Sequence, residues 1–173
     1  MFIVIVGAAV AGIIGVIDVT TRSSADPMIR KQALAIAEAM LEEVQLQPFT
    51  YCDPDDPVAA TALNTAGCGT AEAIGPEAGE TRTSGTTPFD NVNDYQSGGA
   101  GGPGLTVNPI TDLEGTVISG LASYSANVKV AAQALGAVPA TDSLLITVTV
   151  TGPGNTTVTL HGYRTRYAPN DLP

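Results

Sequence analysis

The sequence predicts an α+β roll, in which a long N-terminal helix packs on a C-terminal antiparallel sheet of three or four strands. The first observation is an apolar run without charge over residues 1–17. The second is an amphipathic helical repeat over residues 26–47, and the third is apolar–polar alternation within residues 115–168. A helix with one apolar stripe and a sheet with one apolar face each need a cover, so we expect them to pack together.

The apolar run has three interpretations. Seventeen helical residues extend for about 25 Å, slightly less than a hydrocarbon core of about 30 Å. No basic residue precedes the run and no small-residue cleavage site follows it, which disfavours a secretory signal peptide. A core helix of a soluble domain is unusual at the extreme N-terminus. We therefore prefer a retained apolar helix, residues 1–25, in a membrane or among other helices. We expect it to loosen or kink at Gly12, Gly15 and Pro27.

The amphipathic repeat over residues 26–47 predicts a helix on the globular head, residues 26–173. Asp26 suits a helix N-cap, Pro27 suits the first helical position, and Pro48 ends the pattern. The apolar stripe that we expect to face the sheet consists of Met28, Leu34, Ala37, Met40, Leu41 and Val44.

Residues 48–114 carry no helical or strand period, and we expect an irregular region there. This region contains the chain's two cysteines, Cys52 and Cys68. In an exported protein such a pair predicts a disulfide. A bridge that closes this loop would stabilise the fold by about 3 kcal/mol in the chain-entropy model.

Strand signals fill the predicted sheet region, residues 115–168. Residues 116–121 are apolar and β-branched, while residues 123–132, 144–150 and 156–167 alternate between apolar and polar side chains. The side chains expected to face the helix are Tyr124, Ala126, Val128, Val130, Leu144, Ile146, Val148, Val150, Val158 and Leu160.

Charge and composition exclude several classes of function. Lys and Arg total 7 against 17 Asp and Glu, which gives a net charge of −10, so we expect no nucleic-acid partner. His161 is the one histidine, and the sequence offers no nucleophile or metal set around it. We therefore expect no catalytic residues, no cofactor and no enzymatic activity.

Two acidic turns are candidates for calcium. Asp53, Asp55 and Asp56 alternate with prolines, and Asp90 and Asp94 flank a second polar turn. The spacing of an EF-hand, with its glycine and distal glutamate, is absent. We prefer solvated turns and keep calcium as the alternative.

Three segments of the chain resemble type IV pilins and pseudopilins. The helical segment TTRSSADPMIRKQALAIAEAMLEEV (residues 20–44) is most similar to the minor-pilin group of the mannose-sensitive haemagglutinin pilus, the MshD type. FDNVNDY (residues 89–95) and LHGYRTRYAP (residues 160–169) resemble the same group. The fold that this resemblance implies is the pilin-like roll.

One position departs from the pattern of these families. Type IV pilins begin, after a short basic leader, with a run similar to [FM]TLIELV and a glutamate at its fifth position. Ile5 holds that position here if Met1 is counted as the first residue. We expect that the sequence starts several residues late, and we carry over neither the glutamate nor a processing site.

The resemblance implies a structural subunit of a type IV pilus-like filament. Its partners would be other pilin subunits, the inner membrane before assembly and the pilus assembly machinery, and its final location would be extracellular. The side chains expected to pack in the filament core are Phe2, Ile3, Val6, Val10, Ile13, Ile14 and Ile17. The alternatives are a pseudopilin of a type II secretion system and a membrane-anchored binding module that uses loops 50–104.

Overall fold

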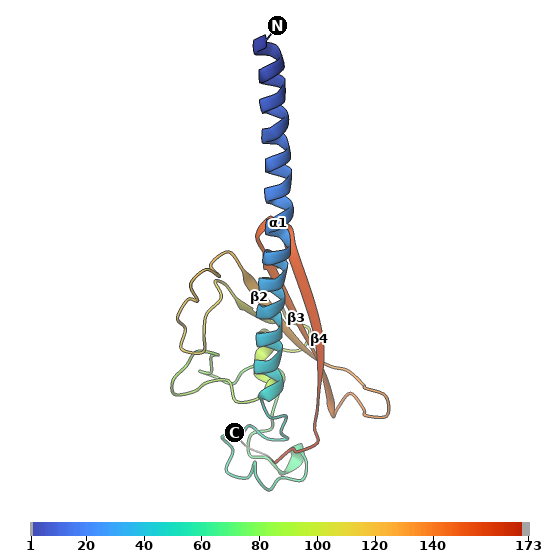
Figure 1. Cartoon of the computed structure of the whole chain (residues 1–173). Helices are drawn as coiled ribbons and strands as arrows, with labels where there is room; N and C mark the ends of the chain where they lie inside the picture. The colour runs from blue at the N-terminus through green and yellow to red at the C-terminus, as the bar shows by residue number, and fades with distance from the viewer. Residues whose placement is uncertain (1, 171–173) are drawn as a thin grey trace.

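In the described part of the chain, one helix packs on a four-stranded antiparallel sheet, and an irregular segment connects the helix to the sheet in sequence (Figure 1). The computed structural model describes the backbone of residues 2–170; within the first 26 residues it describes the side chains of residues 6, 7, 10 and 12–14. The helix is α1 (Phe2–Leu46). The strands lie in sequence order as β1 (Leu105–Val107), β2 (Ser125–Ala132), β3 (Ser143–Gly152) and β4 (Thr156–Thr165). Of three short 3₁₀ turns, η1 (Thr65–Gly67) and η2 (Val92–Tyr95) lie between α1 and β1, and η3 (Pro153–Asn155) joins β3 to β4.

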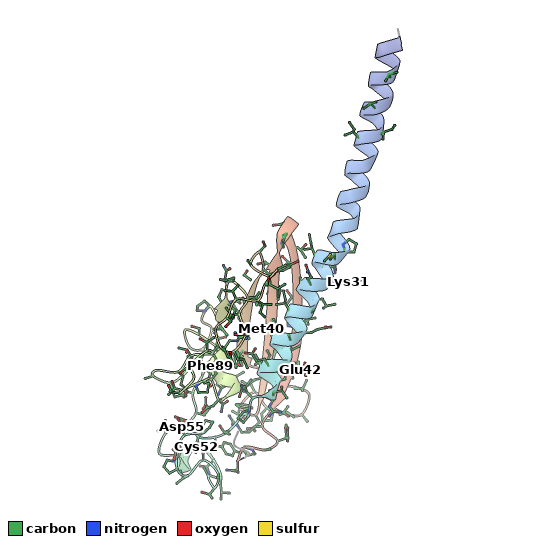
Figure 2. All side chains as sticks on the ribbon, turned by 60° about the vertical axis from the view of Figure 1, so that its left-hand side comes forward. Lys31, Met40, Glu42, Cys52, Asp55 and Phe89 are labelled. Atoms are coloured by element: carbon green, nitrogen blue, oxygen red, sulfur yellow. A yellow bond between two sulfur atoms is a disulfide. The ribbon has the colours of Figure 1, made fainter. Side chains whose placement is uncertain are left out.

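α1 has two parts with different surroundings. Its N-terminal part projects away from the globular head, and the part from Pro27 onward lies along β3 and β4 (Figures 1 and 2). The helix is assigned without interruption through Gly12, Gly15 and Pro27, the positions where we expected it to loosen.

The face of α1 that meets the sheet is narrow and made largely of small residues. Ala33, Ala37 and Val44 are completely buried, and Ile36 and Met40 lie beside them. Their spacing of three and four residues forms one stripe. The prediction was right for Ala37, Met40 and Val44, but wrong for Met28 and Leu34, which are 62% and 38% exposed. Leu34 follows Ala33 by one residue and is therefore turned by about 100° from the centre of the stripe.

Gly162 in β4 lies where the helix and the sheet are close together. A Cβ atom at this position would lie 2.5 Å from Nε2 of Gln45 and 2.9 Å from Cδ1 of Leu41. Both atoms are the ends of flexible side chains, so a larger residue there would require Gln45 and Leu41 to move.

The predicted fold class, the pilin-like roll, is wrong for the described chain. That fold needs an apolar, membrane-anchoring half of the helix ahead of the amphipathic half. The helical segment that packs on the sheet is Pro27–Leu46, and its outer face carries exposed charged side chains such as Lys31, Glu38 and Glu42. Among the described residues, none of the helices combines the length and the apolar character that a membrane crossing requires. The expected core residues Phe2, Ile3 and Ile17 lie outside the residues whose side chains are described.

The alternation of apolar and polar residues in β2, β3 and β4 correctly predicts which side chains face the core. The alternate residues of β3 from Leu144 to Val150 are at most 1% exposed, as are Ala126, Val128 and Val130 of β2. Val158 and Leu160 of β4 pack against the same core, whereas His161 is exposed on the outer face.

The first strand of the sheet is not the one that the sequence predicts. The expected strand over residues 116–121 is wrong. Val117 forms an isolated bridge with Thr111, and Gly115 and Gly120 on either side of it have positive φ. The edge position is taken by β1, which pairs with β2. Gly104 makes this possible, because a Cβ atom there would lie 2.2 Å from the backbone oxygen of Val128.

The irregular segment is anchored by the predicted disulfide between Cys52 and Cys68. Cys52 also forms an isolated antiparallel bridge with Ala71, which brings the two sides of the loop together. The side-chain amide of Asn170 donates hydrogen bonds to the backbone oxygens of Ala59 (2.8 Å) and Ala62 (2.9 Å). These two hydrogen bonds therefore attach the C-terminal segment to the disulfide loop.

We expect the paired substitution Cys52→Ser and Cys68→Ser to lower the free energy of unfolding by about 3 kcal/mol, because the unfolded chain regains the entropy of an open loop. Urea unfolding of the full-length chain, with and without a reducing agent, measures the change. Reductant should destabilise the wild type and leave the variant unaffected. Equal unfolding midpoints for the oxidised wild type and the variant would contradict this expectation.

Candidate functional site

Three features of the described residues are candidates for function: the projecting part of α1, an apolar groove beside α1, and a group of carboxylates near the disulfide loop. His161 belongs to none of them. Its Nδ1 atom lies 3.1 Å from Oγ1 of Thr147 on the exposed face of the sheet. The groups of potential metal ligands found among the described residues do not include it.

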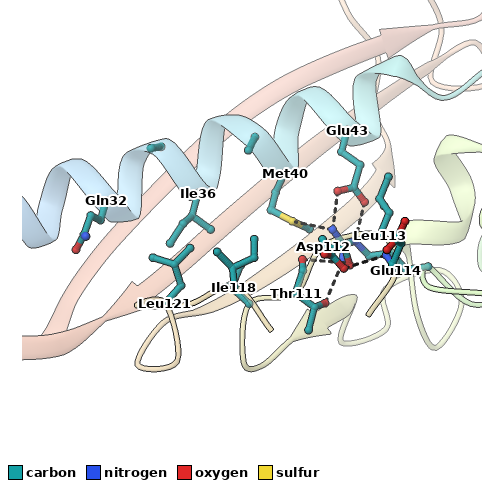
Figure 3. Close-up of a pocket in the computed structure, with 14 residues that line it drawn as sticks. Gln32, Ile36, Met40, Glu43, Thr111, Asp112, Leu113, Glu114, Ile118 and Leu121 are labelled. Atoms are coloured by element: carbon teal, nitrogen blue, oxygen red, sulfur yellow. Dashed lines mark hydrogen bonds and ion pairs between the residues drawn. The ribbon is translucent and has the colours of Figure 1, made fainter. Parts of the chain in front are cut away.

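The groove lies between α1 and residues 110–121, with a volume of about 710 Å³ (Figure 3). Its apolar walls come from Ala35, Ile36, Ala39, Met40, Ile110, Leu113, Ile118 and Leu121. Asp112, at one end, accepts hydrogen bonds from the backbone N–H groups of Glu114 and Thr116. The groove is therefore mainly apolar, and the charged residues that line it are Glu43, Arg82, Asp112 and Glu114.

A buried ion pair closes the same end of the groove. Nε and Nη2 of Arg82 each lie 2.7 Å from a different carboxylate oxygen of Glu43 in α1. Nη1 of Arg82 donates to the backbone oxygens of Thr111 and Asp112, and the hydroxyl of Tyr95 donates to Glu43 (2.9 Å). Burial lowers the pKa of Arg82, but the hydrogen bonds and charge of Glu43 outweigh this effect, so the pKa is raised. Arg82 thus joins α1 to the loop before β2, and Tyr95 joins Glu43 to η2.

We expect Arg82→Met to lower the free energy of unfolding by about 3–5 kcal/mol, because it leaves the carboxylate of Glu43 buried without a counter-charge. The double variant Arg82→Met with Glu43→Gln should recover a large part of that loss. Arg30→Met, at an exposed position of α1, is the control and should change stability by less than about 0.5 kcal/mol. Urea unfolding of the three variants measures these differences. Equal stability of Arg82→Met and Arg30→Met would contradict the structural role of Arg82.

The third feature is the carboxylate cluster, in which side chains from three chain segments meet. Three overlapping sets have potential ligand oxygens within 4.8 Å of one another. Asp90 is shared by two of the sets and Asp94 by two. The cluster consists of Asp53, Asp55, Glu72, Glu77, Glu80, Asp90 and Asp94.

Backbone hydrogen bonds hold the three segments together. Asp53 donates its N–H to the oxygen of Thr70 (3.2 Å), and Glu72 donates to the oxygen of Tyr51 (3.0 Å). Gly75 donates to the oxygen of Asn93 (3.1 Å), which joins the second segment to η2. The disulfide loop and η2 therefore place the carboxylates, although no helix or long strand carries them.

The cluster runs from solvent into the interior. Asp55 is exposed, Asp53 and Asp90 are half-buried, and Asp94 is completely buried. One oxygen of Asp94 accepts hydrogen bonds from the N–H groups of Asp90 (3.0 Å) and Asn91 (2.8 Å), which caps η2. Asp94 is therefore not in a solvated turn, contrary to our preferred interpretation of the sequence.

Burial and mutual repulsion change the acidity of these groups. Burial, with the charges of Glu77 and Asp94, raises the pKa of Glu72 to about 9. Burial raises the pKa of Asp94 to about 8, with a further contribution from Glu80. The pKa values of Asp90 and Glu77 rise to about 7 for the same main reason. The fold thus favours the protonated, neutral form of these four carboxyl groups.

The structure brings together four of the five calcium candidates. The fifth, Asp56, turns away and accepts hydrogen bonds from the N–H groups of Thr70 (2.5 Å) and Val58 (3.0 Å). These hydrogen bonds lower the pKa of Asp56 and give it a structural role. The sequence analysis missed Glu72, Glu77 and Glu80. The available signal was three glutamates in a glycine-rich stretch between two aspartate turns.

No family model, curated protein or solved structure matches the chain. The resemblance to pilins therefore stays a hypothesis, and function has to be argued from the features of the molecule itself.

Proposed function

We propose that the protein is a structural subunit of an extracellular filament of the type IV pilus kind, in which α1 packs against α1 of neighbouring subunits. The observation that carries this proposal is the exposure of Val6 (43%), Val10 (49%), Ile13 (60%) and Ile14 (61%) on the projecting part of α1 (Figures 1 and 2). The proposal does not depend on the pilin-like roll.

The spacing of these four side chains supports helix–helix packing. Intervals of four, three and one residue place them on one side of the helix. Burial of a Val or Ile side chain is worth about 1.5–3 kcal/mol relative to water, so a helix that exposes several gains stability from a partner. The described part of the head leaves them uncovered, which favours a neighbouring subunit as the cover.

Two properties of the head fit an extracellular subunit. The disulfide between Cys52 and Cys68 is typical of proteins that fold in an oxidising compartment. The disulfide loop lies at the end of the molecule opposite the N-terminus of α1 (Figure 1). In a filament built on α1, this end is available to the outer surface.

We expect the paired substitution Ile13→Asp and Ile14→Asp to abolish assembly, because each subunit contact loses about 3–6 kcal/mol of apolar burial. The full-length chain is produced in the cells that encode it, and sheared surface fibres are examined by electron microscopy and mass spectrometry. The control is Val58→Asp with Leu63→Asp, which adds the same charge at positions of the disulfide loop that are 39% and 85% exposed.

The wild type and the control should be recovered in fibres, and the α1 variant should not. The proposal fails if the wild type is absent from every fibre preparation. It also fails if the α1 variant enters fibres as well as the control does.

A further inference from the structure

We propose that the inner half of the carboxylate cluster, formed by Glu72, Glu77 and Asp94, binds Ca²⁺. The ligand oxygens of the three carboxylates lie within 4.8 Å of one another. This inference is independent of the proposed assembly through α1, because it concerns the opposite end of the molecule (Figure 2, where Cys52 and Asp55 mark that end).

Several buried oxygens in the cluster have no hydrogen-bond partner. Both carboxylate oxygens of Glu72 are buried and unpartnered, and so is Oδ1 of Asp94. Asp94 is 0% exposed, so water does not reach its free oxygen. A buried charged group without a partner costs several kcal/mol, and proteins avoid this cost by pairing the charge or by coordinating a metal.

A neutral side chain next to the cluster is also incompletely paired. Asn93 is 3% exposed, and its side-chain amide lies within hydrogen-bonding reach of Glu72. Its Oδ1 atom has no hydrogen-bond partner among the described residues, so the fold leaves one more buried polar atom unpaired beside the carboxylates.

Among the described residues, none of the Lys and Arg side chains forms an ion pair with the cluster. The ion pairs that the described residues form, Arg82 with Glu43 and Arg166 with Asp142, use carboxylates outside the cluster. Arg166 is near enough to Glu72 to sense its charge, but its guanidinium also stacks on Phe49 and Tyr51 (3.9 and 4.8 Å to the ring centres). The negative charge of the cluster is therefore left for an external ion.

The chemistry of the ligands selects calcium. All of them are oxygens, and neither His nor Cys is among them, which disfavours zinc and other transition metals. Ca²⁺ accepts six to eight oxygens in flexible geometry, whereas Mg²⁺ requires a near-ideal octahedron and keeps several waters. Carboxylates carried on irregular loops suit the flexible geometry of Ca²⁺ better than the octahedron of Mg²⁺. Glu80 and Asp90 form a second set of potential ligands with Asp94 and add further carboxylates next to the proposed site.

The test uses the full-length chain, freed of metals with a chelator and titrated with CaCl₂ by calorimetry and by thermal unfolding. We expect saturable binding and a Tm that rises with Ca²⁺ concentration, because the ion binds the folded state alone. MgCl₂ at equal ionic strength should bind at least about tenfold more weakly. No heat and no change in Tm up to about 10 mM, well above the weakest extracellular range of roughly 10⁻³ M, would overturn the proposal. An equal response to Mg²⁺ would also overturn it.

The variant Glu72→Gln with Asp94→Asn keeps the shapes of the ligands and should bind Ca²⁺ at least about tenfold more weakly. Its control is Glu38→Gln with Glu42→Gln, which removes the same charge from exposed positions of α1. Without Ca²⁺ the first variant should be at least as stable as the wild type. If loss of the Asp94 cap prevents the double variant from folding, Glu72→Gln alone replaces it in the test. This single change breaks no hydrogen bond, because both oxygens of Glu72 lack a partner. The same Ca²⁺ affinity in the Glu72→Gln chain and the control would refute the site.

Discussion

The buried ion pair between Arg82 and Glu43 holds the irregular middle of the chain to α1. Phe89, Val92 and Tyr95 belong to the core beside α1, but the described segment between α1 and β1 has only short turns to place them. Arg82 makes two hydrogen bonds to Glu43, and Tyr95 adds a third to the same carboxylate. A desolvated pair of this kind adds little net stability when it replaces apolar contacts, but it fixes one arrangement, since removal of either partner leaves a buried charge.

η2 connects this ion pair to the carboxylate cluster. Two consecutive residues of the turn serve the two features, because Asp94 enters the cluster and Tyr95 contacts Glu43. The capping hydrogen bonds to Asp94 and the edge-to-face contact between Phe89 and Tyr95, with ring centres 5.1 Å apart, restrict the turn. A cation held by Asp94 would therefore order the same turn that positions Tyr95 over α1. Cation binding and the packing of the middle segment are coupled through it.

The sequence predicts those parts of the fold whose pattern is local. Alternation in β2, β3 and β4 identifies their buried faces, because a strand turns alternate side chains to the core. The sequence wrongly places Met28 and Leu34 on the buried face of α1. The true face contains alanines, whose apolar character is too weak to reveal its position on the helix. β1 is missed because it has three residues and depends on Gly104 approaching β2. Glu72, Glu77 and Asp94 come together through turns and long-range hydrogen bonds, which no sequence period records.

The acidity of the chain sets a requirement for the assembly that we propose. At a formal net charge of −10, heads that crowd around a common helical core would repel one another, and the apolar packing of α1 would have to exceed that repulsion. A bound Ca²⁺ would reduce this charge by less than its own +2, because Glu72 and Asp94, with pKa values of about 9 and 8, are largely protonated near pH 7 and would release protons as the ion binds. The repulsion between heads would therefore have to be offset mainly by the helix packing at the opposite end of the molecule.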